Sequence, residues 1–169
     1  MQIPLRILVA EDNPDDVFFL RIAFEQAGLL ASVNFVRDGR ELIDYIKGVP
    51  PFANRLLYPL PTMLLLDLGL PYIDGFRFLT WLRKEPELQD LAVIILSGSE
   101  ASLDFERSYG LGAIDYLVKP HNPQQLISMI HKLERIWQQL NAQPVLDTAG
   151  NLPSELLNTP DRNTRPLSA

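Results

Sequence analysis

The sequence contains no cysteine, which excludes disulfide bonds, iron–sulfur clusters and zinc sites built from thiolates. Its two histidines, His121 and His131, are too few for a conventional zinc site. Positive charge is also in deficit: 15 Lys and Arg stand against 21 Asp and Glu, for a net charge of −6, so no nucleic-acid partner is expected. No apolar run reaches the roughly 20 residues of a transmembrane helix, so no membrane partner is expected either. Because residues 1–6 show no signal-peptide pattern, we expect a cytoplasmic protein.

What the chain does contain is a regular alternation of short apolar runs and amphipathic segments. The apolar runs predict five strands, at residues 6–10, 33–36, 63–67, 92–97 and 114–118. The amphipathic segments predict five helices, at about residues 14–27, 39–47, 75–84, 101–109 and 123–140. Five such strand–helix units predict an α/β protein, with a parallel sheet between two layers of helices.

Two stretches depart from this alternation. Residues 49–62 hold four prolines and cannot form a regular helix, so we expect an insertion there. Its packing residues would be Phe52, Leu56, Leu57 and Tyr58. Residues 143–169 hold four more prolines and show no periodicity, so we expect a mobile tail after one folded domain of residues 1–142. We expect no output domain, because the tail is too short for a DNA-binding or catalytic module.

Carboxylates stand at the ends of two predicted strands. Asp67 follows the apolar run Met63–Leu66, and Glu11 and Asp12 follow the first strand. Parallel strands end at one edge of the sheet, where open α/β folds bind ligands, so the three carboxylates are expected to meet. Crowded carboxylates repel each other unless a cation neutralises them, and Mg²⁺ prefers such ligands together with carbonyls and waters. The carbonyl of Gly69 can turn toward the same ion. The alternative is that Glu11 and Asp12 merely begin the next helix.

Two further strand ends carry groups that suit a phosphoryl ligand. The fourth strand ends at Ser97, which places a hydroxyl at the same edge. Lys119 follows the fifth strand, and Pro120 holds it in an extended turn, where its compact charge can contact a phosphoryl oxygen. Taken singly, Ser97 is more often a turn residue and Lys119 a solvated surface lysine. Together with three acids at one edge, they favour phosphoryl chemistry.

These residues together resemble the receiver domain of two-component response regulators. The resemblance covers about residues 4–140. It rests on Glu11-Asp12, Asp67, Ser97 and Lys119-Pro120, each after its strand, and on Asp74-Gly75 and Tyr116. For the fold, it implies a flavodoxin-like, doubly wound five-stranded parallel sheet in the order 2-1-3-4-5, with helices on both faces.

For the chemistry, the resemblance implies that Asp67 accepts a phosphoryl group from a phosphohistidine on a sensor histidine kinase. Asp12, Asp67 and the Gly69 carbonyl would bind Mg²⁺ directly, and Glu11 would bind it through water. Such a protein is a signalling component and not an enzyme. A phosphatase with an aspartyl nucleophile is the competing interpretation, but it generally needs a second acid two residues on, where Gly69 stands.

For the switch, the resemblance implies that Lys119 contacts the phosphoryl group and Ser97 closes on it, which lets Tyr116 turn inward. The signal would then leave through the surface of the fourth helix, fifth strand and fifth helix. Two alternatives stay open. One is a binding module that has lost phosphorylation. The other is a nucleotide-binding protein, although Gly110–Ala113 precedes a strand where that motif would follow one.

A narrower resemblance links the chain to the single-domain regulators that are paired with phytochromes. It rests on residues 11–16, the connection at 50–61, residues 83–88 and Trp137. It implies a phytochrome-like sensor kinase, a downstream protein or phosphotransfer partner, and a homodimer. The dimer or partner face is expected on apolar residues of the last two helices: Leu103, Phe105, Tyr109, Ile127 and Ile136. The alternative is that some of them complete the core.

Overall fold

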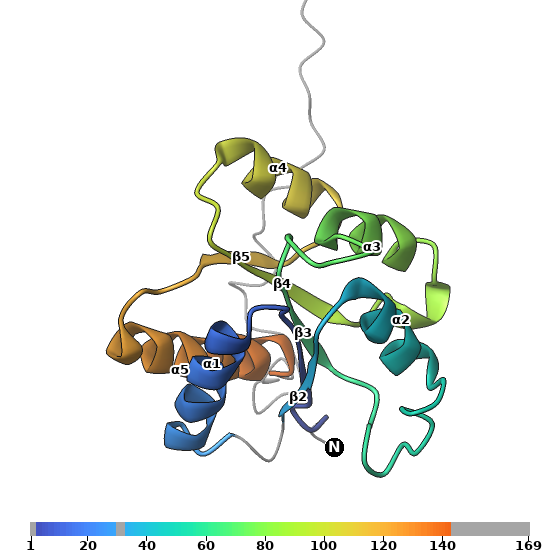
Figure 1. The fold of residues 1–169 in the computed structure, drawn as a ribbon, viewed down its shortest axis with the longest axis horizontal. Helices are drawn as coiled ribbons and strands as arrows, with labels where there is room; N and C mark the ends of the chain where they lie inside the picture. The colour runs from blue at the N-terminus through green and yellow to red at the C-terminus, as the bar shows by residue number, and fades with distance from the viewer. Residues whose placement is uncertain (1–2, 30–32, 143–169) are drawn as a thin grey trace, which may run out of the picture.

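The fold is a five-stranded parallel sheet between two layers of helices, in a computed structural model that describes residues 3–29 and 33–142 (Figure 1). The strand order is β2-β1-β3-β4-β5, the predicted 2-1-3-4-5 order. The strands are β1 (Ile7–Ala10), β2 (Val33–Val36), β3 (Met63–Leu66), β4 (Ala92–Ser97) and β5 (Asp115–Val118). All four neighbouring pairs are parallel, so every strand ends at the same edge of the sheet.

The helices divide unequally between the two faces of the sheet (Figure 1). On one face lie α1 (Pro14–Gln26) and α5 (Pro123–Leu140). On the other face lie α2 (Gly39–Lys47), α3 (Gly75–Leu82) and α4 (Ser102–Gly110), and a short 3₁₀ helix, η2 (Pro86–Leu88), precedes β4. Among the described residues, no helix is both long and apolar enough to cross a membrane.

Side-chain alternation along the central strands builds a core on each face. Successive residues of a strand point to opposite faces, so Leu64 and Leu66 pack under α2 and α3, while Met63 and Leu65 pack under α1 and α5. All four residues of β3 are fully buried. This is why the strand reads as an unbroken apolar run in the sequence.

The first helix starts where the sequence predicts, and its start shapes the functional edge. Asn13 caps α1, because its Oδ1 accepts hydrogen bonds from the backbone N–H groups of Asp15 (2.9 Å) and Asp16 (3.2 Å). Pro14 occupies the first helical position, where no backbone N–H is needed. The cap places both acids in the first turn of α1, directly after the carboxylates that end β1.

The insertion at 49–62 contains no helix or strand and packs differently from the prediction. Phe52 and Tyr58 do pack inward and form an aromatic cluster with Tyr45 of α2. The prediction was wrong for Leu56 and Leu57, which are 93% and 65% exposed. Polar contacts hold the loop instead, since the guanidinium of its Arg55 lies against the C-terminus of α2.

The end of α5 also differs from its amphipathic pattern. Leu140 falls on the same helical stripe as Ile130 and Leu133, which are buried, yet Leu140 is 54% exposed. The buried residues of α5 are Met129, Ile130 and Leu133, and the partly buried Ile136 and Trp137 pack against the same core. The predicted tail at 143–169 lies outside the described residues, so its boundary stays a prediction.

Candidate functional site

Three carboxylates meet at the carboxyl edge of the sheet. Glu11 and Asp12 follow β1, and Asp67 follows the neighbouring strand β3. One oxygen from each of the three lies within 4.8 Å of the others. Glu11 is 1% exposed and Asp67 is 9% exposed, whereas Asp12 is open to solvent. The arrangement brings together the acids that the sequence placed at the strand ends.

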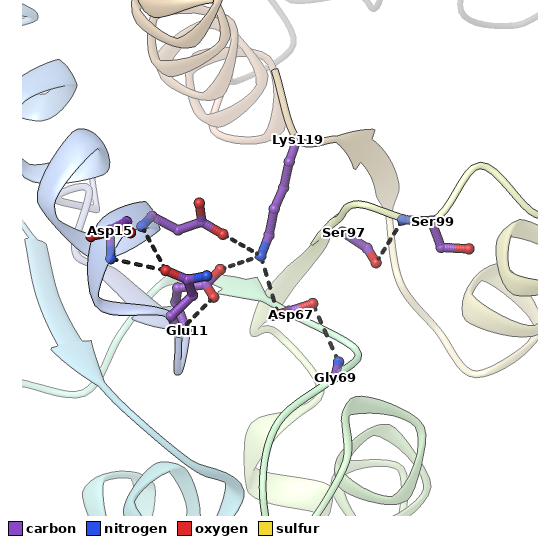
Figure 2. A network of polar contacts seen from close by, with 9 residues as sticks. Glu11, Asp15, Asp67, Gly69, Ser97, Ser99 and Lys119 are labelled. Atoms are coloured by element: carbon purple, nitrogen blue, oxygen red, sulfur yellow. Dashed lines mark hydrogen bonds and ion pairs between the residues drawn. The ribbon is translucent and has the colours of Figure 1, made fainter. Parts of the chain in front are cut away.

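Lys119 enters this acidic cluster from the end of β5. Its Nζ lies 2.6 Å from Glu11 Oε2 and 3.2 Å from Asp67 Oδ2 (Figure 2). The side chain is 19% exposed, so its stem is largely covered by protein. The lysine reaches Asp67 across β4, which separates the two strands in the sheet. The structure therefore joins a cation and an acceptor carboxylate that lie far apart in the chain.

Electrostatics in the cluster follow from burial and crowding. Burial raises the pKa of Glu11, and the nearby Asp67 charge adds to this, while Lys119 opposes it. For Lys119, burial acts to lower the pKa, but the contacts with Glu11 and Asp16 and the charge of Asp67 outweigh it and raise the pKa. Lys119 is therefore a permanent cation among carboxylates.

The carboxylate of Asp67 is also held by the loop that follows it. Asp67 Oδ1 accepts a hydrogen bond from the backbone N–H of Gly69 at 3.3 Å (Figure 2). A Cβ at position 69 would stand 3.8 Å from Asp67 Oδ2, so any side chain there would lie against the carboxylate. Glycine thus leaves Asp67 open on that side. The metal-binding role predicted for the Gly69 carbonyl stays a prediction.

Asp16 is a site residue that the sequence reading missed. Its Oδ2 accepts a hydrogen bond from Lys119 Nζ at 2.9 Å. The sequence pointed to Asp16 only as a first-turn acid of α1, which explains its helical role but not this contact. A signal was nonetheless present, because Asn13-Pro14 starts α1 immediately after β1 and so keeps its first turn at the same edge of the sheet.

The residues present fit a hard divalent cation. Glu11 Oε2 is buried, and within the described part of the chain it makes no hydrogen bond beyond its 2.6 Å ion pair with the Lys119 ammonium. Oxygen atoms of three acids within one small volume are the ligands that Mg²⁺ prefers. Such an ion would relieve the repulsion between carboxylates that Lys119 alone only partly offsets.

The sequence comparisons agree with this geometry. Residues 7–131 match the family described as the response regulator receiver domain. The chain belongs to this family. Receiver domains take part in signal transduction with sensor histidine kinases, and Asp phosphorylation and Mg²⁺ are general features of the family.

Individual relatives cover nearly the same length as this receiver. The probable methanogenesis regulatory protein FilR2 of Methanothrix harundinacea is 30% identical over 141 residues, which span 83% of this chain and 88% of the relative. The response regulator RPA3017, in red light signaling of R. palustris, is 36% identical with a TM-score of 0.75, over 84% of this chain and 99% of that one.

Two further similar receivers were solved in a phosphorylated form and in a metal-bound form. The phosphorylated cyanobacterial phytochrome response regulator RcpA is 30% identical with a TM-score of 0.72, over 85% of this chain and all of that one. The Mn²⁺-bound form of the response regulator Rcp1, known from Synechocystis, is 27% identical with a TM-score of 0.70, over 84% of this chain and all of that one.

The two residues predicted to form the switch, Ser97 and Tyr116, are linked by contacts with Ser99. Ser97 is buried, and its Oγ accepts a hydrogen bond from the backbone N–H of Ser99 at 3.2 Å (Figure 2). Tyr116 is also buried, and its hydroxyl donates to the Ser99 carbonyl at 3.0 Å. Ser99 thus links the predicted pair, a role that sequence reasoning missed. In this structure Tyr116 already points inward.

The five residues predicted as a dimer or partner face of the receiver do not share one surface. Leu103 and Tyr109 of α4 are exposed, at 74% and 48%. Phe105 packs on the ring of Tyr116, with the centroids 4.1 Å apart. Ile127 and Ile136 of α5 pack against the core on the α1 side of the sheet. The division follows from the fold, because α4 and α5 pack on opposite faces of the sheet, and the partner face stays a prediction.

A cavity of about 290 Å³ opens between α1 and α5, next to the end of β5. We call it the α1/α5 cavity; its lining includes Asp16, Phe19, Ile22, Lys119 and Ile127. Phe19 is 51% exposed, and its neighbour Phe18, which packs edge-on against it, is 59% exposed. Two phenylalanines of α1 are therefore exposed to solvent next to the acidic cluster.

Proposed function

We propose that this receiver accepts a phosphoryl group on Asp67 from a phosphohistidine of a sensor histidine kinase, in a reaction that depends on Mg²⁺. The observation that carries the proposal is the position of Lys119 Nζ, 3.2 Å from Asp67 Oδ2 and beside the three clustered carboxylates. Phosphoryl transfer needs positioning and charge neutralisation more than an elaborate base, and this cluster supplies both.

The transfer forms one bond to phosphorus and breaks another. An oxygen of Asp67 attacks phosphorus, a P–O bond forms, and the P–N bond to the kinase imidazole breaks with its electron pair leaving on nitrogen. The Asp67 carboxylate becomes an acyl phosphate, which carries two negative charges where the carboxylate carried one. Lys119 is placed to donate to one phosphoryl oxygen, because its Nζ already contacts the acceptor carboxylate.

Asp12 and Asp67 would bind the Mg²⁺ directly, and Glu11 would bind it through water. When bound, the ion supplies the positive charge that offsets the incoming phosphoryl group. The Mn²⁺-bound Rcp1 relative supports this assignment, as does the carboxylate cluster of this chain. The Gly69 carbonyl is proposed as a further ligand from the family resemblance.

We propose an acceptor that carries one phosphoryl group, not a turnover phosphatase. Gly69 stands two residues after Asp67 and offers no general acid, although its backbone N–H contacts the carboxylate. Hydrolysis of the acyl phosphate would still reset the receiver. The protein would then act as a signalling component rather than an enzyme.

The test is phosphorylation by acetyl phosphate, followed by intact mass. Wild-type protein with Mg²⁺ should gain one acid-labile phosphoryl group, and chelation by EDTA should prevent the gain. Asp67→Asn should gain none, while Asp15→Asn, which removes an exposed acid of α1, should behave as wild type. An unmodified wild-type protein would favour the phosphorylation-independent module, and steady release of phosphate from unrelated phosphomonoesters would favour the phosphatase.

We further propose that the kinase docks over the α1/α5 cavity and the exposed phenylalanines of α1. A kinase histidine must approach Asp67 closely, and Phe18 and Phe19 are the most exposed large apolar side chains of the helix that starts beside it. Apolar surface next to a reactive group is typical of a transient protein interface. Phe19→Glu should slow transfer from a kinase at least tenfold, a loss of about 1.4 kcal/mol.

The same variant separates docking from chemistry. Because Phe19 does not contact Asp67 in the described structure, Phe19→Glu should keep the acetyl phosphate reaction. Leu103→Glu, an equally polar change at an exposed site of α4, is the matched control and should leave kinase transfer intact. Equal loss from both phosphodonors would show that the substitution disturbs the site itself.

We propose a phytochrome-type kinase as the partner, because the similar regulator RPA3017 takes part in red light signaling and the similar regulator RcpA is a phytochrome response regulator. Transfer from a phosphorylated phytochrome kinase should outpace transfer from a non-photosensory histidine kinase.

We also propose, from the resemblance, that the output signal passes through the surface of α4, β5 and α5. Its receiver would be a downstream protein or phosphotransfer partner, and the protein would form a homodimer. Exposed Leu103 and Tyr109 support a contact on α4. A cytoplasmic location is proposed on the same basis.

A further inference from the structure

The structure assigns Asp16 as a positioning residue that draws Lys119 away from the phosphoryl group and so limits phosphorylation of Asp67. The inference rests on the proposed function, because it concerns how Lys119 serves that reaction. It concerns a residue outside the carboxylates that end β1 and β3. Asp16 instead belongs to the first turn of α1 and lies on the side of Lys119 that faces the α1/α5 cavity.

The argument begins with the donors of Lys119. An ammonium group has three N–H donors, and its Nζ has three carboxylate neighbours: Glu11 at 2.6 Å, Asp16 at 2.9 Å and Asp67 at 3.2 Å. Asp67 is the most distant of the three. Each neighbour therefore competes for a donor that a phosphoryl oxygen on Asp67 would need.

The three neighbours differ in what they do when the site is loaded. Glu11 lies with Asp12 and Asp67 in the carboxylate cluster, so a cation bound there would give it a second positive partner. Asp16 is outside that cluster and has no other cationic partner among the described residues. Its carboxylate is 39% exposed, so water can solvate it after Lys119 leaves. The Asp16–Lys119 contact is thus the one that phosphorylation would break.

Asp16 opposes phosphorylation through its negative charge as well as by occupying one N–H donor of Lys119. A phosphoryl group on Asp67 is dianionic, and the Asp16 carboxylate contacts the same ammonium group. Replacing the carboxylate by an amide removes one negative charge and weakens the hold on Nζ, while keeping the size of the side chain. The phosphorylated form should therefore gain relative to the unphosphorylated form.

The experiment measures the ratio of phosphorylated to unphosphorylated protein at limiting acetyl phosphate and fixed Mg²⁺. In this reaction Asp67 attacks phosphorus, and the P–O bond to acetate breaks with its electron pair leaving on acetate. Asp16→Asn should raise the ratio roughly threefold to tenfold, the gain expected from one freed charged hydrogen bond. Asp15→Asn is the matched control, since it removes the same charge one residue away, and its carboxylate makes no ion pair in the described part of the chain.

A double-mutant cycle separates positioning from a structural role of Asp16 at the start of α1. In a Lys119→Ala background, Asp16→Asn should no longer change the ratio. An effect of Asp16→Asn that persists without Lys119, or one equalled by Asp15→Asn, would overturn the inference. A lower ratio would overturn it too, because Asp16 would then support the reaction.

A crystal structure with Mg²⁺ and beryllofluoride on Asp67 gives a readout that does not depend on any variant. Lys119 Nζ should contact a fluoride and leave hydrogen-bonding distance of Asp16. Retention of the 2.9 Å contact in that structure would overturn the inference. If wild-type protein takes no phosphoryl group at all, the proposed function fails, whereas a phosphorylated wild type with an unchanged Asp16→Asn ratio sinks this inference alone.

Discussion

Lys119 Nζ lies 3.2 Å from Asp67 Oδ2, although the two residues are 52 positions apart in the chain. The contact crosses from β5 to β3 at the carboxyl edge of the sheet. It places the positive charge of the site against the carboxylate that we propose as phosphoacceptor. The same ammonium group also contacts Glu11 and Asp16, so one lysine offsets three acids.

Removal of this charge should destabilise the protein when no divalent cation is present. Lys119→Met keeps an apolar stem but leaves Glu11 and Asp67 facing each other, and we expect a loss of about 2 kcal/mol in the free energy of unfolding. Urea denaturation in EDTA measures it. Mg²⁺ should restore more stability to the variant than to wild type. Lys132→Met is the control, since that exposed lysine pairs with Asp115 at the surface and should matter little. An unchanged Lys119→Met would contradict the buried-charge argument.

A close approach between the start of α2 and the loop that follows Asp67 makes position 39 sensitive to side-chain size. A Cβ at Gly39 would overlap the backbone carbonyl oxygen of Ile73, and the N–H of Gly39 donates to the Pro71 carbonyl at 3.2 Å. Gly39→Ala should therefore shift the loop that follows Asp67 and cost about 1–3 kcal/mol of stability. Thermal unfolding measures this, with Gly110→Ala as the control, because a Cβ there meets nothing within 4 Å. Equal stability of the two variants would count against the overlap.

The insertion at 49–62 should depend on one guanidinium group. Arg55 donates to the carbonyls of Tyr45 and Ile46 at the end of α2, each at 2.7 Å, and the Tyr45 carbonyl also accepts from the N–H of Gly48. Arg55→Ala removes two short hydrogen bonds from the last turn of α2 and takes the guanidinium donor away from the Ile46 carbonyl, so we expect a loss of about 2 kcal/mol. Limited proteolysis should then cut within the insertion first. Arg37→Ala, at an exposed surface pair with Glu41, is the control and should leave the cutting pattern unchanged.

Alkaline pH should destabilise the fold through Tyr45. Burial raises the pKa of Tyr45 from 10.0 to about 12, and its hydroxyl donates to the Pro59 carbonyl at 3.1 Å. The folded state prefers the neutral phenol, so this stability is complete below the unfolded pKa and is lost as pH rises through the folded one. Between about pH 9 and pH 12, wild type should lose roughly 2–3 kcal/mol more than Tyr45→Phe, which cannot ionise. Parallel urea curves across this range would show that Tyr45 ionises freely.

Local sequence was enough for the strands and for the start of most helices. β2 and β4 begin and end where the apolar runs do, and α2 matches its predicted range. The reason is that a strand covered on both faces needs unbroken apolar residues, and caps such as Asn13 are local signals. The prediction from local pattern failed for Leu56 and Leu57, which are exposed to solvent. The reason is that hydrogen bonds from Arg55 attach this loop to α2, so the two leucines are not needed to hold it.

The sequence by itself determined which residues reach the functional edge of this receiver: Glu11, Asp12, Asp67, Ser97 and Lys119 each follow a strand, and parallel strands end together. Only the tertiary structure decided which of these side chains touch. Asp16 and Lys119, 103 positions apart, contact each other because α1 starts directly after β1. Likewise, Ile127 packs with the core on the α1 face of the sheet, whereas exposed Leu103 belongs to α4 on the opposite face. Periodicity fixes which face of an element is apolar, but the angle between packed elements and the rotamer at their contact depend on the whole core.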